Sequence, residues 1–304
     1  MPLTLPQLSR REFLKRAALA GTAASFVPSL FAELAVKPGD PDTFFFLSDT
    51  HIAGEAATIS HGVNMTNHLS TVVREVLAWP VAPAAIIVNG DLAFKLGLAG
   101  DYTAFGKLIE PLRALAPMHL TLGNHDQRDN FWQAFPLDAT KSESVPQKQV
   151  AILSGARANW FLLDSLDITG KYAGQLGAAQ IEWLVREIEA RPDKPALVVC
   201  HHHLDRLGEV GGLKDSTAMI ELLANHRQVK AFIYGHTHNW HVSQHEKGLH
   251  LVNLPPTAYV FEPGRPSGWV CAKLSDNGAE LELRSLDQKH PELGQMKRLE
   301  WRTS

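Results

Sequence analysis

Five short polar motifs stand in a fixed order along this 304-residue chain, and each one follows a run of apolar residues. The motifs are Asp49-Thr50-His51, Gly90-Asp91, Gly123-Asn124-His125-Asp126, His201-His202-His203 and Gly235-His236-Thr237-His238. The preceding runs, such as Phe44–Leu47 and Ala85–Val88, have the length and composition of buried strands. Ligands of an open α/β sheet bind at the carboxyl ends of its strands, because the loops there converge on a crevice. The sequence therefore predicts that the five motifs meet in one site.

The side chains in these motifs are carboxylates, imidazoles and an amide, with no thiolate among them. Such groups are the ligands that Zn, Mn and Fe accept, so the motifs indicate hydrolytic chemistry and not sulfur redox chemistry. A lone Asp-x-His motif occurs often by chance on solvated turns. The recurrence of the pattern after five strands argues against five independent surface loops. Gly90, Gly123 and Gly235 allow tight turns and close backbone approach beside the ligands.

In this order the motifs resemble those of the calcineurin-like metallophosphoesterase family, namely Asp-x-His, Gly-Asp, Gly-Asn-His-Asp or Glu, a lone His, and Gly-His-x-His. The likeness runs from about Asp49 to His238 and covers most of the chain. It implies an α/β fold, a four-layer α/β/β/α sandwich of two mixed sheets. It also implies a phosphoric ester hydrolase that uses a hydroxide bridging two metal ions. The ions would be divalent or of mixed valence, Mn, Fe or Zn.

A narrower likeness bears on the substrate. Leu163-Asp164-Ser165 and Gln180–Leu184 are similar to segments of class III cyclic nucleotide phosphodiesterases. This favours a small phosphodiester as the substrate. The alternatives are a phosphomonoesterase that uses the same site, with Arg128 as a cationic group for the phosphate, and a non-catalytic, protein-binding member of the fold.

The family resemblance also implies the metal ligands. Asp49, His51 and His238 would hold the first metal, and Asp91 would bridge the two ions. Asn124, His236 and one His of the triplet would hold the second metal. Strand geometry favours His201 in that role because it is the first residue after the apolar run, and His202 is the alternative.

Two residues of the third motif are predicted to act near the phosphate. By the resemblance, His125 points at the phosphate and stabilises charge or protonates the leaving oxygen. Asp126 either orients the His125 imidazole through a hydrogen bond or caps a turn. For the aromatic residues Trp240 and Tyr259, packing in the core or at a rim is favoured over stacking on a substrate ring.

The N-terminus carries a targeting signal. Residues 9–15 read Ser-Arg-Arg-Glu-Phe-Leu-Lys, which is typical of a twin-arginine export signal, and an apolar stretch follows from Ala17 to Phe31. That stretch is broken by Gly, Thr, Ser and Pro and is too short to predict a stable membrane span. We expect residues 1–35 to be a signal peptide for the twin-arginine export machinery, with the periplasm or the exterior as destination.

Composition limits the partners of the chain. The formal net charge is −3, and the residues after the basic N-terminal segment are more acidic still. This balance argues against a nucleic-acid binder, whose affinity depends on clustered Lys and Arg, and favours a small phosphoester. The two cysteines, Cys200 and Cys271, lie in or beside apolar runs, as buried free thiols do.

The remaining pattern predicts one large domain over residues 36–285, followed by a polar C-terminal tail over residues 286–304. Helices are expected at Asn67–Trp79, Tyr102–Leu115, Gln180–Ala190 and Ser216–His226, alternating with strands. After Tyr234 the pattern changes to a meander of strands at His250–Leu254, Trp269–Leu274 and Glu280–Arg284, with a hairpin turn signal at Asn277-Gly278.

Overall fold

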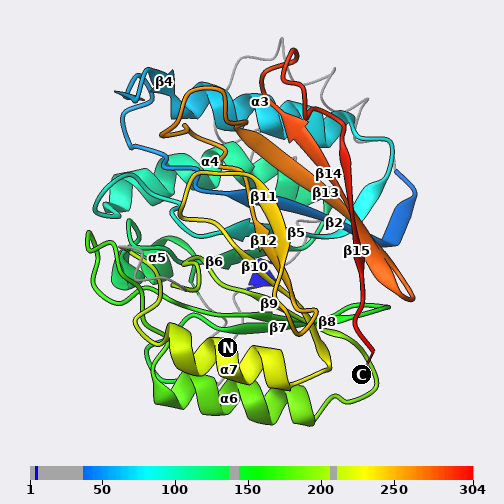
Figure 1. Ribbon diagram of the computed structural model, residues 1–304. Coiled ribbons are helices and arrows are strands. Elements are labelled where there is room, and N and C mark those ends of the chain that lie inside the picture. Colours follow the sequence, from blue (N-terminus) through cyan, green and yellow to red (C-terminus); the bar gives the residue numbers. More distant parts are fainter. Residues whose placement is uncertain (1–3, 6–36, 137–143, 206–210, 304) are drawn as a thin grey trace.

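The computed structural model describes residues 4–5, 37–136, 144–205 and 211–303. Two large β-sheets lie at the centre of the protein, and helices cover the outer face of each (Figure 1). The order of the layers is helices, sheet, sheet, helices. The four-layer α/β/β/α sandwich predicted from the sequence is therefore confirmed.

The first sheet has seven strands in the order β1-β6-β5-β2-β13-β14-β15. The central strands β2, β5 and β6 run parallel, and the other neighbours pair antiparallel. In chain order the strands are β1 (Thr4–Leu5), β2 (Gly39–Ser48), β5 (Ala82–Asn89), β6 (Met118–Thr121), β13 (Gly268–Ser275), β14 (Gly278–Ser285) and β15 (Met296–Glu300). Its outer face is covered by α3 (Met65–Ala78), α4 (Ala99–Leu115) and α5 (Arg128–Ala134).

The second sheet has six strands in the order β11-β12-β10-β9-β8-β7. Its four inner strands are parallel, and the two edge strands are antiparallel to them. In chain order the strands are β7 (Ala151–Ser154), β8 (Asn159–Leu162), β9 (Ala196–Val199), β10 (Val229–Tyr234), β11 (His241–Gln244) and β12 (His250–Asn253). Helices α6 (Ala178–Glu189) and α7 (Ser216–Asn225) cover it, and a small hairpin of β3 (Ile59–Ser60) and β4 (Val63–Asn64) precedes α3.

Both faces of the central strands are buried, which explains their continuous apolar runs. In β2, Phe44 and Phe46 point into the core between the sheets, whereas Phe45 and Leu47 pack against the helices. The same alternation places Trp160 of β8 between the sheets and Phe161 under the helices on the other side. A strand that is buried on both faces cannot easily shift in register, so its carboxyl end is held at a fixed position.

The four predicted helices are confirmed to within a few residues at their ends. The meander is confirmed only for β13 and β14, which form a hairpin through Asp276 and Asn277. The strand predicted at His250–Leu254 instead joins the second sheet as β12, parallel to β10.

The prediction of a peripheral polar tail after Ser285 is wrong for its last part. Residues 296–300 form β15, which pairs with β14 and buries Leu299. The guanidinium of Arg302 then donates hydrogen bonds to backbone carbonyls, among them those of Leu223 and Val229 at α7 and β10. The C-terminal segment therefore ties the first sheet to the helical layer of the second.

The signal peptide predicted at residues 1–35 lies outside the described residues, apart from Thr4 and Leu5, whose backbone pairs with β6. Within the described residues, none of the helices has the length and apolar character needed to cross a membrane.

Candidate metal centre

The five polar motifs lie together at the carboxyl ends of β2, β5, β6, β9 and β10. Strands from both sheets end at this edge, so the motifs approach one another from two directions. They surround a pocket of about 330 Å³. Of the predicted residues, those that line it are His51, Asp91, Asn124, His125, His236 and His238. The convergence predicted from the sequence is present.

Asp49, His51 and His238 form the first half of the site. Their potential ligand atoms all lie within 4.8 Å of one another. Nε2 of His51 is 2.9 Å from Nε2 of His238, and the latter atom is 3.4 Å from Oδ1 of Asp49. These are the three residues that the family resemblance assigns to the first metal.

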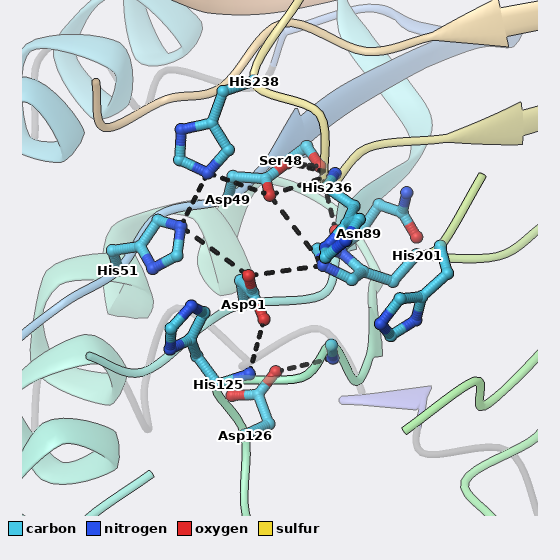
Figure 2. A network of polar contacts seen from close by, with 12 residues as sticks. Ser48, Asp49, His51, Asn89, Asp91, His125, Asp126, His201, His236 and His238 are labelled. Atoms are coloured by element: carbon cyan, nitrogen blue, oxygen red, sulfur yellow. Dashed lines mark hydrogen bonds and ion pairs between the residues drawn. The ribbon is translucent and has the colours of Figure 1, made fainter. Parts of the chain in front are cut away.

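Asp91, His201 and His236 form the second half and satisfy the same distance limit. Figure 2 shows Asp91 between the two halves, with His51 on one side and His201 on the other. Oδ2 of Asp91 lies 3.7 Å from Nε2 of His51 and 3.3 Å from Nε2 of His201. Asp91 therefore occupies the place of a bridging carboxylate, and the amide of Asn124 lines the same pocket.

The backbone at these residues is unusual. Within the described part of the chain, eight residues other than glycine have positive φ, and five of them are Asp49, His51, Asp91, His236 and His238. Such a conformation costs on the order of 1 kcal/mol or more per residue and persists where the surroundings enforce it, often at functional sites. The turns around these residues are also closely packed, since a Cβ on Gly123 would lie 2.3 Å from Oδ1 of Asp91.

Backbone carbonyls fix the orientation of two of the imidazoles. Nδ1 of His201 lies 3.0 Å from the carbonyl oxygen of Asn89, and Nδ1 of His238 lies 2.6 Å from that of Tyr259. A carbonyl oxygen can only accept, so each contact places a proton on Nδ1 and leaves Nε2 as the atom that a metal ion would bind. This is the arrangement by which proteins orient histidine ligands.

Burial controls the protonation of the histidines. It lowers the pKa of His51 and His236 well below the usual range and also lowers the pKa of His238. These imidazoles are therefore neutral, which is the form that binds metals. At His201 burial acts in the same direction, but the carboxylates of Asp91 and Asp49 outweigh it and raise its pKa to about 10.

The carboxylates respond in opposite directions. Burial raises the pKa of Asp49. Burial acts on Asp91 as well, but the nearby His201 outweighs it and holds the pKa of Asp91 well below its usual range. A positive partner thus stabilises the charge of the central carboxylate.

Two unsatisfied buried atoms test whether metal ions fit this site. Nε2 of His201 and Oδ1 of Asn124 have no hydrogen-bond partner among the described residues. A buried polar atom without a partner is costly, and a cation at the second half-site would satisfy both. Nε2 of His51 and Nε2 of His238 face each other at 2.9 Å, so a cation at the first half-site would replace the proton that they share. The residues present therefore fit two metal ions.

The geometry separates the two candidates in the histidine triplet. His201 belongs to the cluster of ligand atoms with Asp91 and His236. Nδ1 of His202 lies 2.7 Å from Oγ of Ser165, and among the described residues His202 belongs to none of the clusters of ligand atoms. This favours His201 as the ligand.

The two remaining predicted residues have different surroundings. His125 lines the pocket, its backbone N–H donates to Oδ1 of Asp91, and its Nδ1 lies 2.8 Å from the carbonyl oxygen of Lys95. Of the two alternatives for Asp126, the hydrogen bond to this imidazole is not formed, and the structure has the turn cap. The Asp126 carboxylate accepts bonds from the backbone N–H groups of Leu92, Ala93 and Gly123 and from the Tyr102 hydroxyl. It closes the turns that carry Asp91 and Asn124.

Five pocket residues were not predicted as site residues. They are Tyr172, His203, Thr237, Tyr259 and Phe261. His203 and Thr237 lie inside the motifs, so the sequence already indicated that they are close to the site. Tyr172, Tyr259 and Phe261 come from loops without a periodic pattern, and only the tertiary fold brings them to the pocket. The prediction that Trp240 packs in the core is confirmed, whereas Tyr259 is buried but also lines the pocket.

Comparison with known sequences identifies the group to which these motifs belong. The pattern of the family described as calcineurin-like phosphoesterase matches residues 43–240. The chain is similar to a 3′,5′-cyclic adenosine monophosphate phosphodiesterase of Pseudomonas aeruginosa, with 30% identity over 246 residues, 76% of this chain and 85% of that protein. A cAMP/cGMP dual specificity phosphodiesterase of Mycobacterium tuberculosis is 30% identical over 200 residues, 63% of this chain and 60% of that protein.

Solved structures share the fold at lower sequence identity. A dimetal phosphatase from Danio rerio superposes with a TM-score of 0.68 at 14% identity, covering 86% of this chain and 100% of that one. A purple acid phosphatase from yellow lupin superposes with a TM-score of 0.60 at 14% identity, covering 86% of this chain and 53% of that one.

Proposed function

The chain belongs to the calcineurin-like phosphoesterase family, and from this premise we propose that it hydrolyses a small phosphodiester, specifically a 3′,5′-cyclic nucleotide. It is a metallophosphoesterase, and its His and Asp cluster is compatible with a dinuclear metal site. The proposal concerns the substrate. It is supported by the charge of the pocket and by the phosphodiesterase activities of the chain's relatives.

The observation that carries the proposal is that none of the described residues lining the pocket is Lys or Arg. A phosphomonoester carries a second negative charge, which favours sites with extra cations around the phosphate. Arg128 was the candidate for that role. Its guanidinium instead forms a two-pronged ion pair with the buried carboxylate of Asp164, at 2.8 and 2.9 Å, and also donates to the Leu166 carbonyl. A diester with a single charge is the better match.

The chain's own residues define the roles in the reaction. Two bound metal ions would supply an activated water and neutralise charge on the phosphoryl oxygens. Asp49, His51 and His238 would hold one ion, Asn124, His201 and His236 the other, and Asp91 both. The His125 imidazole, oriented by the Lys95 carbonyl, is placed to stabilise charge on the phosphate or to protonate the leaving oxygen.

The test compares a diester with a monoester that has the same leaving group. Purified protein loaded with Mn, Zn or Fe is assayed with bis-p-nitrophenyl phosphate, p-nitrophenyl phosphate and 3′,5′-cyclic AMP. We expect both diesters to be cleaved with higher kcat/KM than the monoester. Higher kcat/KM for the monoester with every metal would overturn the proposal, and so would the absence of cyclic AMP hydrolysis by a protein that cleaves the nitrophenyl diester.

We also propose that residues 1–35 act as a twin-arginine signal that directs the protein to the periplasm. The motif from Ser9 to Lys15 and the apolar stretch after it support this. Changing Arg10 and Arg11 together to Lys should retain the protein in the cytoplasm, as measured by immunoblots of cell fractions. Unchanged export of the double variant would contradict the proposal.

A further inference from the structure

One wall of the pocket is aromatic and partly open to solvent. We call it the aromatic shelf and define it as Tyr259 and Phe261, which line the pocket, with His61 packed against both rings. The Tyr259 ring stacks on the His61 ring with centroids 4.4 Å apart and planes inclined by 26°. Phe261 meets the same imidazole edge-on at 5.4 Å. Tyr259 is buried, but the side chain of Phe261 is 57% exposed.

The aromatic shelf is continuous with the first half of the metal site. Phe261 stacks on His238 with centroids 4.3 Å apart and planes 22° from parallel. Tyr259 stacks on His51 at 5.2 Å and 23°. A group that lies on the exposed part of Phe261 is therefore next to the metal-binding residues, within the same pocket.

The chemistry of the shelf limits what it can bind. Its partly exposed ring offers a flat π surface, and the described pocket lining offers no cation for a second phosphate. A volume of about 330 Å³ is near the lower end for small-ligand pockets and favours one small molecule over a polymer or an acyl chain. Aromatic side chains hold nucleobases by stacking, whatever the base.

We propose that the aromatic shelf is the binding surface for the nucleobase of the substrate, with Phe261 as the stacking residue that determines specificity. The inference rests on the proposed phosphodiesterase function and adds the substrate group that the pocket selects. The base lies on Phe261, and the phosphodiester then lies over Asp91. Because stacking is sequence-tolerant, the shelf selects a planar ring and not one particular base.

The experiment compares two diesters that share the nitrophenolate leaving group. One is thymidine 5′-(p-nitrophenyl) phosphate, and the other is methyl p-nitrophenyl phosphate, which has no base. The readout is the ratio of their kcat/KM values. We expect Phe261→Ala to lower this ratio about tenfold, mainly through the KM of the thymidine ester. Phe261→Leu, which keeps an apolar side chain without a ring, should lower it almost as much.

The matched control is Met296→Ala, because Met296 is an exposed apolar residue on β15, away from the lining of the pocket. The ratio should stay within twofold of the wild-type value. If Phe261→Leu keeps the wild-type ratio of the two kcat/KM values, an aliphatic contact is sufficient to bind the base, and the proposal is overturned. Equal losses for both esters, with loss of metal by elemental analysis, would show that Phe261 only supports His238.

A second measurement separates failure of the shelf from failure of the proposed function. If the wild-type protein cleaves neither diester, the phosphodiesterase proposal fails. The shelf is then tested by calorimetric binding of AMP and of inorganic phosphate to the metal-loaded protein. Tighter binding of AMP that weakens about tenfold in Phe261→Ala supports the shelf. Equal affinity for AMP and phosphate in the wild-type protein overturns it.

Discussion

Nε2 of His201 lies 3.3 Å from Oδ2 of Asp91, and both side chains are almost completely buried. The other oxygen of the same carboxylate accepts a hydrogen bond of 2.8 Å from the backbone N–H of His125. Asp91 is thus held from both sides, with its charge between the two halves of the metal site. Its two acceptor oxygens are what a bridging ligand needs.

Replacing Asp91 by Asn should abolish activity, because the amide has one acceptor oxygen and no charge. We expect turnover of bis-p-nitrophenyl phosphate to fall by about a thousandfold, on the scale of losing a central electrostatic contact. Elemental analysis reports metal content alongside the rates. Asp129→Asn, an exposed carboxylate in the first turn of α5, is the matched control. Metal-replete Asp91→Asn protein that keeps most of its turnover would show that Asp91 does not bridge.

Substitution of His201 and substitution of its neighbour His202 should have different effects on the metal content of the protein. His201→Ala should lose about one metal ion per chain, because Nε2 of His201 points into the ligand cluster. His202→Ala should keep both ions, because His202 does not belong to the cluster of ligand atoms that Asp91, His201 and His236 form. Inductively coupled plasma mass spectrometry of the two variants measures this directly. If His202→Ala loses one ion and His201→Ala keeps both, then His202 is the metal ligand and His201 is not.

The convergence of the motifs could be predicted from the sequence because the information for it is local. Each motif directly follows an apolar run, and strands such as β5 and β9 end where those runs end. Once the strands are parallel neighbours in a sheet, their carboxyl ends must share an edge.

Other features depended on contacts that sequence patterns do not encode. β15 was missed because Met296-Lys297-Arg298-Leu299-Glu300 is mostly polar, and as an edge strand it buries only Leu299. The sequence left the role of Asp126 open, because three of the four donors that meet its carboxylate, Leu92, Ala93 and Tyr102, come from distant segments. Phe261 reaches the pocket only through the loop between β12 and β13.

The position of Asp126 predicts a structural effect. Asp126→Ala removes the acceptor for three backbone N–H groups and for the Tyr102 hydroxyl, all of them buried, and should lower the free energy of unfolding by about 3 kcal/mol or more. Tyr102→Phe removes one of these bonds and also the bond that its hydroxyl accepts from the Gln127 backbone N–H, so it should cost about 2 kcal/mol. Urea denaturation of both variants provides the values. If Asp126→Ala keeps wild-type stability but loses turnover, Asp126 acts in the reaction with His125 and is not a structural residue.

His119 predicts how stability depends on pH. This β6 residue is 2% exposed, and burial lowers its pKa from 6.5 to about 4. The unfolded chain therefore takes up a proton near pH 6.5, whereas the folded chain does so only near pH 4. Stability is unaffected above this window and declines as the pH falls through it, by on the order of 3 kcal/mol in total.

His119→Gln removes this titration, so its free energy of unfolding should decline less than that of the wild-type protein between pH 7 and pH 4. Metal-binding residues titrate in the same window, but their contribution is common to both proteins and cancels in the difference. His241→Gln, at an exposed position, should follow the wild-type curve. The contradicting outcome is a free energy of unfolding that declines as steeply with pH in His119→Gln as in the wild-type protein. It would mean that His119 is protonated as readily in the folded state as in the unfolded one.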